Sequence, residues 1–276
     1  MITIVTDSSV CLKKAEAEAL SVRLVPLNYT VDGQSYSESY SDHNGDFETL
    51  LRGSGAYSGA YTTSHPNLAA YLSCFEEELQ KNNEVLCITI SSRLSGAYST
   101  AYASAKQTEN KGIAVFDSLL TAGGLYLLVK EAKKLVEQGL GLGEILDVLP
   151  AIRDRISIAF SVEDMAPLRK SGRLGFVRMN VGTILNIKPI LLCKDGAVVS
   201  DKVVRGNAEV IKSLVAKIDN NAREVVINYI GDNHLASNLY HVAAEAFPQT
   251  KITLQKVGPV LGIHLGLKVI AVSFIY

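Results

Sequence analysis

The sequence lacks an excess of charge of either sign. It has 276 residues, with 27 Lys and Arg against 28 Asp and Glu, and a formal net charge of -1. Generic nucleic-acid binding needs a concentrated basic surface, so this balance argues against it. Hydrophobic residues make up 47% of the chain and the mean hydropathy is +0.17, values that allow a large buried core.

Long apolar runs are also missing. The longest, such as residues 119–129, fall well short of the roughly 20 residues that a membrane-spanning helix needs. We therefore expect no stable membrane insertion. The N-terminal segment has no basic residues, and its first charged residue is Asp7. This pattern predicts a strand and not a secretion signal.

Cysteine and histidine are few, and neither forms a ligand pattern. The four Cys contain no CxxC pair, and the five His contain no HExxH or His-x-His pair, so no metal is expected. Cys74 and Cys87 stand in apolar surroundings and are expected to be buried small hydrophobic residues. Unpaired cysteines are typical of a reducing compartment, which predicts a cytoplasmic location.

Two familiar catalytic motifs are absent. The chain has neither a GxSxG nucleophile elbow nor a GxxxxGK[ST] phosphate loop. The segment GLGLGE at 139–144 resembles a dinucleotide fingerprint, but it follows a helical pattern instead of a strand. It predicts the end of one helix and the start of the next.

The chain is long for one domain and its pattern changes near the middle. In the first half, apolar strands at 2–7, 85–90 and 113–118 each precede a helical pattern, which predicts parallel βαβ units. After about residue 157 the chain is rich in strands, with a hairpin at 190–204 around an Asp-Gly turn.

These patterns predict an α/β protein of two domains. The first, residues 1–154, is a three-layer domain with a parallel sheet and a small lid insertion at about 24–60. Within the insertion, 29–36 carries an Asp-Gly hairpin signal and 53–61 is a stretch of small residues. The second domain, residues 155–276, is of the α+β class.

Two hydroxyl-rich turns open helices. The strand at 85–90 runs into SSRLSGAYSTA, which places Ser95 and Gly96 at the start of a helix. The second turn, AYTTSHPN, carries Thr63 and Ser64, with Pro66 predicted at the first helical position. Free N–H groups and the helix dipole suit such turns to a carboxylate or phosphate. Ordinary helix capping is the other interpretation, and both stay open.

Other segments also allow two interpretations. Basic residues at 169, 170 and 173 either face an anion or acidic partner, or form a solvated loop. His264 lies between glycines in an apolar segment and is either a ligand-binding or a structural histidine. The apolar stretch 179–192 predicts core packing or the wall of an apolar tunnel.

Taken together, these segments resemble the DegV family of bacterial proteins, which includes the fatty-acid-binding FakB proteins. The resemblance rests on the order and spacing of IVTDSS, TTSHP, ISSRLSGAYSTA, VFDSLLTAGGL, FSVEDMAPLRKSGRLG, NIKPIL and GPVLGIHLG, and it runs nearly end to end. The chain departs from the family pattern at His65, where Gln is usual, and at Leu267 and Lys268, where Pro and Gly are common.

The resemblance implies a carrier that holds a long-chain fatty acid between its two domains. It implies no other cofactor and no catalytic residue. The residues that it places near the acyl carboxylate are Thr63, Ser64, Ser95, Gly96 and His264.

In FakB systems the bound acid is phosphorylated by a separate ATP-dependent kinase subunit, FakA. The resemblance therefore implies a FakA-type partner, with Arg173 and Arg205 as docking residues. Two alternatives remain. One is a serine-dependent hydrolase or transferase that uses Ser95 with His264 as base, and the other is a carrier of a different amphipathic carboxylate.

Overall fold

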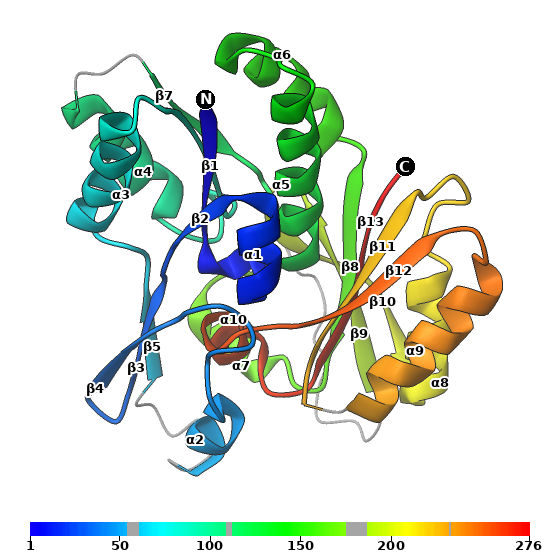
Figure 1. Cartoon of the computed structure of the whole chain (residues 1–276). Coiled ribbons are helices and arrows are strands. Elements are labelled where there is room, and N and C mark those ends of the chain that lie inside the picture. The colour runs from blue at the N-terminus through cyan, green and yellow to red at the C-terminus, as the bar shows by residue number, and fades with distance from the viewer. Residues whose placement is uncertain (54–60, 109–111, 175–186, 232) are drawn as a thin grey trace.

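A computed structural model describes residues 1–53, 61–108, 112–174, 187–231 and 233–276 (Figure 1). Four parallel strands form the first sheet: β1 (Ile2–Asp7), β2 (Val22–Val25), β6 (Glu84–Thr89) and β7 (Ile113–Asp117). Their order across the sheet is β2-β1-β6-β7. Consecutive apolar residues in the central strands are buried because helices cover both faces of the sheet.

The helices around this sheet form the outer two of three layers. On one face, α3 (Leu68–Gln80) packs through Tyr71 and Phe75 against Val5 and Cys87, and α4 (Ala97–Gln107) joins the same cluster through Ala101. The opposite face is covered by α1 (Lys14–Leu20), α5 (Ala122–Glu137) and α6 (Leu142–Arg153). Asp7 at the end of β1 leads into a 3-10 turn, η1 (Ser8–Val10).

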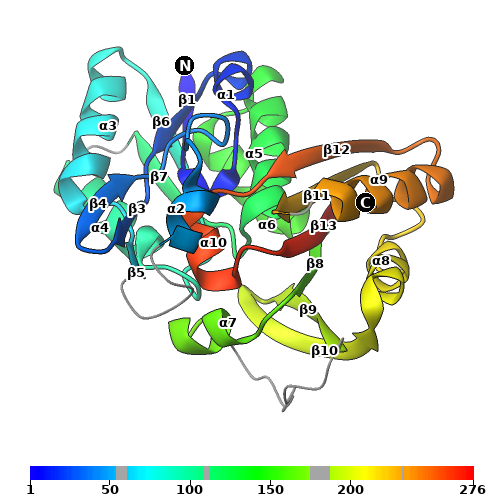
Figure 2. The ribbon, with the colours of Figure 1, turned by 90° about the horizontal axis from the view of Figure 1, so that it is seen from below.

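A second sheet has six strands and mixed direction. It contains β8 (Ile156–Val162), β9 (Ile187–Lys194), β10 (Ala197–Arg205), β11 (Glu224–Ile230), β12 (Lys251–Lys256) and β13 (Val269–Ile275). The order is β10-β9-β8-β13-β11-β12, and only the β11–β12 pair is parallel among these neighbours. The helices α8 (Gly206–Val215) and α9 (Asn233–Ala246) pack on its outer face (Figures 1 and 2).

Helix α5 lies between the two sheets and joins them into one core (Figure 1). Its first turn approaches the six-stranded sheet closely, because a Cβ at Gly123 would lie 2.4 Å from Oδ1 of Asn228. Farther along the helix, the Lys130 ammonium donates to both carboxylate oxygens of Glu224 on β11. Contacts to this helix thus help to fix the relative position of the two sheets.

A small antiparallel sheet forms much of the insertion. Its strands are β3 (Asn28–Val31), β4 (Gln34–Ser37) and β5 (Tyr61–Ser64), in the order β4-β3-β5, and α2 (Phe47–Gly53) follows β4. The predicted hairpin is confirmed: Asp32 and Gly33 have φ of 50° and 82°, as a type I′ turn requires. Of the predicted small-residue stretch, residues 54–60 lie outside the described part of the chain.

Two short helices complete the fold: α7 (Ala166–Ser171) follows β8, and α10 (Pro259–Leu265) precedes β13. The predicted end and restart of a helix at 139–144 is confirmed, since Gly139 has φ of 86° and α6 begins at Leu142. The position predicted for Pro66 is wrong. The Asn67 side chain accepts from the Ala70 N–H and caps α3, so Pro66 precedes the cap.

The predicted α/β class is confirmed. The four parallel strands all lie before residue 118, and the six-stranded sheet begins at Ile156. The boundary at 154/155 falls between α6 and β8 and stays a prediction. Within the described ranges, no helix combines the length and the apolar character needed to cross a bilayer.

Candidate functional site

A cavity lies where the first sheet, the small sheet and the six-stranded sheet meet. Most of its wall is apolar and comes from both halves of the chain, including Leu27, Ile90, Phe160, Leu168, Leu261 and Ala271. These side chains belong to a cluster of buried hydrophobic residues distinct from the one around α5. The cavity therefore offers apolar surface to a ligand over most of its length.

The polar part of the wall contains all the residues predicted to bind a head group. Thr63 and Ser64 come from β5, Ser95 and Gly96 from the start of α4, and His264 from α10. The fold thus brings three distant segments to one cavity. Their roles in binding stay a prediction.

Thr63 and His264 form the best-defined contact of this group. The Thr63 Oγ1 atom lies 2.6 Å from Nε2 of His264, and Nδ1 of the same ring is buried without a partner among the described residues. Burial, with a smaller contribution from the positive charge of Arg173, lowers the pKa of His264 to about 4. The imidazole is therefore neutral at physiological pH.

Either tautomer of His264 leaves a donor hydrogen of this pair unused. If Nε2–H donates to Thr63, the threonine hydroxyl hydrogen is unused. If the hydroxyl donates to Nε2, the hydrogen lies on Nδ1, which has no partner. The pair is consequently able to donate to an oxygen atom of a ligand.

The turn before α4 is packed against the turn that contains His65. A Cβ at Gly96 would lie 2.8 Å from Cε1 of the His65 ring, so only glycine fits without movement. The Ser95 hydroxyl accepts from the Ala97 N–H at 3.3 Å. The interpretation of Ser95 as the N-cap is wrong, because Gly96 is the N-cap of α4 and makes no side-chain cap; Ser95 lies one residue earlier and lines the cavity.

The two predicted docking arginines lie in different places. Arg173 lines the cavity, donates through Nη1 to the carbonyl of Ser171, and reaches the carbonyl of Leu94 at 3.4 Å. Arg205 is exposed at the end of β10, beside the start of α8, and is not part of the cavity wall. Of the apolar segment at 179–192, predicted to be core or tunnel wall, residues 179–186 lie outside the described ranges. The rest belongs to β9, where Ile190 and Leu191 are buried in the core.

Several residues of the site were not predicted from the sequence. Thr121 and Asn228 also line the cavity, and the Thr121 hydroxyl is buried without a partner among the described residues. A lone Asn within the apolar strand EVVINYI was the available signal for Asn228. Among the described residues, His, Cys, Asp and Glu form no group suited to a metal ion.

Comparison with known proteins identifies the family. The model of the DegV family, described as uncharacterised, matches residues 1–276. The chain belongs to the DegV family. A curated relative, a DegV domain-containing protein of Halalkalibacterium halodurans, is 31% identical over 271 residues, which are 96% of this chain and 95% of the relative.

Solved structures of other DegV proteins share the fold. A fatty-acid-binding DegV family protein from Thermus thermophilus is 27% identical with a TM-score of 0.86, covering 100% of this chain and 99% of that one. The fatty acid kinase B3 (FakB3) protein of Streptococcus pneumoniae, loaded with linoleic acid, is 20% identical with a TM-score of 0.86 over the same shares. The resemblance inferred from the sequence motifs is therefore confirmed.

Proposed function

We propose that this DegV protein binds a long-chain fatty acid, with the acyl chain in the apolar cavity and the carboxylate at its polar end. The observation that carries the proposal is the Thr63–His264 pair, which has a donor hydrogen to spare in the wall of a mainly apolar cavity. Ser95, Gly96 and Ser64 lie in the same wall and complete the proposed head-group site. The fatty acids bound by the Thermus and Streptococcus relatives support this ligand class.

The energetics favour an acyl ligand. Burial of a methylene group contributes about 0.8 kcal/mol, so an ordinary fatty chain gains on the order of 10 kcal/mol before the costs of association. Burial of the carboxylate opposes binding, because a buried charge loses its hydration and needs hydrogen-bond donors in exchange. Thr63, Ser95 and His264 supply such donors, and the nearby charge of Arg173 attracts an anion.

We further propose that the protein presents the bound acid to a separate kinase subunit. That subunit would transfer the terminal phosphoryl group of ATP to a carboxylate oxygen, leaving ADP and an acyl phosphate. Arg173 at the cavity and Arg205 on the surface are proposed to contact the kinase. The FakB3 protein among the structural relatives supports this role for the carrier.

The competing hydrolase would need a direct link between Ser95 and His264. Among the described residues, no hydrogen bond joins these two side chains, and His264 Nε2 contacts Thr63 instead. The two functions are separated by incubating the protein with oleic acid and with an activated-ester probe. The proposed carrier binds oleic acid reversibly and its Ser95 stays unlabelled.

The variant Ser95→Ala tests whether Ser95 binds the head group or acts as a nucleophile. Its control is Ser92→Ala in the same turn, because Ser92 is exposed and does not line the cavity. The Ser95 variant should weaken oleic acid binding without unfolding the protein. Esterase turnover that disappears in Ser95→Ala, with no oleic acid binding in the wild type, would establish the hydrolase. Displacement of oleic acid by a chemically different amphipathic carboxylate of higher affinity would establish the third possibility.

A further inference from the structure

Glu38 is a buried carboxylate that the proposed head-group site does not include. It follows β4 and is 1% exposed. Its Oε2 atom accepts from the Ser8 hydroxyl at 2.6 Å, and its Oε1 atom accepts from the Val260 N–H at 2.9 Å. A buried carboxylate is costly to keep, so its two contacts indicate a specific task.

The contact to Val260 fixes the start of α10. Pro259, the first residue of this helix, has no N–H, so the N–H of Val260 is the first that the helix has to satisfy. The residue before the helix, Gly258, leaves room for the carboxylate, because a Cβ there would lie 2.3 Å from Oε1 of Glu38. The backbone at the start of α10 is thus built around Glu38.

His264 lies on the same face of α10 as Val260, four residues and about one turn later. It contacts Thr63 on β5, and both β5 and β4 pair with β3. The small sheet therefore contacts α10 at two points. Glu38 holds the start of the helix, and Thr63 holds its histidine.

We propose that Glu38 is a positioning residue for the head-group site: by holding the Val260 N–H, it sets where α10 presents His264 to Thr63. The consequence for ligand binding rests on the proposed function, but the effect on the His264 ring does not.

Because the Glu38 carboxyl titrates near neutral pH, its contact to α10 should depend on pH. Burial, assisted by the negative charge of Asp7, raises the pKa of Glu38 to about 7, although the bonds from Ser8 and Val260 oppose the shift. The other titratable groups that face it are Asp7 at the end of β1, the Cys11 thiol and the Tyr29 phenol, and burial raises the pKa of each of them. The thiol and the phenol stay protonated near neutral pH, so the two carboxyls, Glu38 and Asp7, are the groups of this cluster whose charge changes, and replacing Glu38 isolates its own contribution.

The ionised form of Glu38 makes the stronger contact to α10. A charge-assisted hydrogen bond is roughly twice as strong as a neutral one. The contact at the start of the helix therefore weakens as the pH falls through about 7, without being broken.

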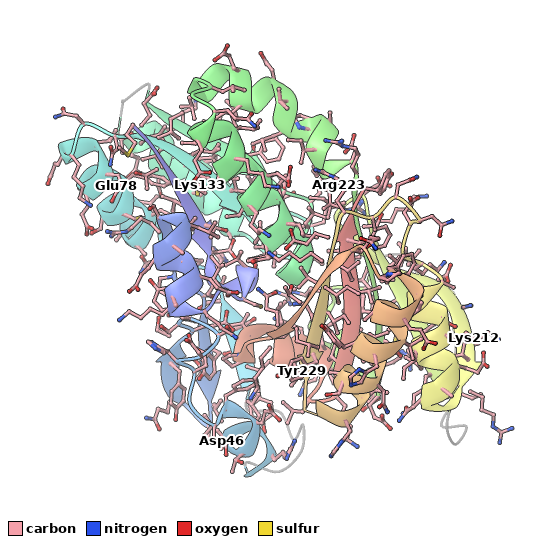
Figure 3. All side chains as sticks on the ribbon, turned by 45° about the vertical axis from the view of Figure 1, so that its right-hand side comes forward. Asp46, Glu78, Lys133, Lys212, Arg223 and Tyr229 are labelled. Carbon is pink, nitrogen blue, oxygen red and sulfur yellow. The ribbon has the colours of Figure 1, made fainter. Side chains whose placement is uncertain are left out.

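Glu38→Gln is the variant that tests this inference. Its amide oxygen still accepts from Val260 and its amide nitrogen donates to Ser8, so the side chain fits but neither carries charge nor titrates. Glu78→Gln is the matched control, because Glu78 is also buried, at 3% exposure, and also accepts several hydrogen bonds. It belongs to α3 and lies far from α10 (Figure 3).

The measurements are the ring ¹⁵N shifts of His264 without ligand, and the affinity for carboxyl-¹³C oleic acid from pH 5.5 to 8.5. At pH 8, Glu38→Gln should shift the His264 resonances and weaken oleic acid binding by roughly 5- to 30-fold. Wild-type affinity should show a step near pH 7 that is absent in Glu38→Gln and present in Glu78→Gln.

The inference is overturned if Glu38→Gln matches the wild type in both measurements at every pH. It is also overturned if Glu78→Gln has the same effects as Glu38→Gln, because the role would then be one of general stability. If the wild type binds no oleic acid, the proposed function fails, while the His264 shifts still decide whether Glu38 positions the histidine.

Discussion

His264 and Thr63 are 201 positions apart in the chain, yet their side chains meet with Nε2 of the histidine 2.6 Å from Oγ1 of the threonine. The contact joins α10 of the second half to β5 of the first. It lies in the wall of a mainly apolar cavity, where a buried polar atom without a partner, such as Nδ1 of His264 among the described residues, is costly and would gain from a ligand oxygen.

Replacement of Thr63 by Val should weaken fatty-acid binding and also lower the stability of the fold. The change removes the hydroxyl and leaves His264 without its partner, so fatty-acid affinity should fall by roughly 10- to 100-fold and stability by about 1–3 kcal/mol. Isothermal titration and urea unfolding measure the two effects. Thr62→Val, an exposed neighbour on β5, is the control and should change neither. Equal effects of the two variants would argue against a special role for Thr63.

The low pKa of His264 predicts a pH dependence of stability. Because burial lowers its pKa from 6.5 to about 4, the unfolded chain binds more protons than the folded one between these values. The stabilising contribution is complete above pH 6.5 and is lost as the pH falls through about 4, with a size of up to about 3 kcal/mol.

Urea unfolding of the ligand-free protein at several pH values measures this contribution. His264→Gln should flatten the slope of stability against pH between 4 and 6.5, whereas His241→Gln, which changes an exposed histidine of α9, should not. A slope that is the same in His264→Gln and in the wild type would show that burial does not lower the pKa of His264 in the wild-type protein.

The order of elements and most of the turns could be predicted from the sequence, because they depend on local chemistry. The run at 85–90 becomes β6, and both Asp-Gly hairpins have the positive φ values of type I′ turns, with Asp195 at 50° and Gly196 at 79°. Pro66 was misplaced by two residues because Asn67, a stronger N-cap, starts the helix.

The site could be predicted only in part. Thr63, Ser95 and His264 stand in recognisable motifs, and the fold brings them to one cavity. Glu38 has no such signal, since a glutamate after a hairpin strand is usually exposed. Its burial depends on packing against Ser8 and the start of α10, contacts that span 30 and 222 positions.

The contact of Gly96 with His65 predicts a coupled pair of substitutions. Gly96→Ala brings a Cβ to within 2.8 Å of the ring of His65, an exposed side chain, so the ring should be displaced at a cost of about 1 kcal/mol of stability. In a His65→Ala background the ring is gone, so the same change should cost at least about 0.5 kcal/mol less. A double-mutant cycle by urea unfolding measures this coupling, and additive effects would contradict the packing described for the two turns.

The position of α5 between the sheets depends on Gly123. A Cβ there would lie 2.4 Å from Asn228 Oδ1 and 2.9 Å from Ser273 Oγ, so Gly123→Ala should destabilise the protein by about 1–3 kcal/mol. Gly143→Ala, on the open surface of α6, is the control and should stabilise by about 0.5–1 kcal/mol. Thermal unfolding compares the two, and a neutral Gly123→Ala would show that α5 is free to shift away from the six-stranded sheet.

The most direct test of the central claim is organic-solvent extraction of the purified wild-type protein, followed by mass spectrometry of the extract. Binding in the cavity predicts about one long-chain fatty acid per protein molecule, and a smaller amount from Thr63→Val than from Thr62→Val. An extract without fatty acid, from protein that also fails to take up added oleic acid, would contradict the claim.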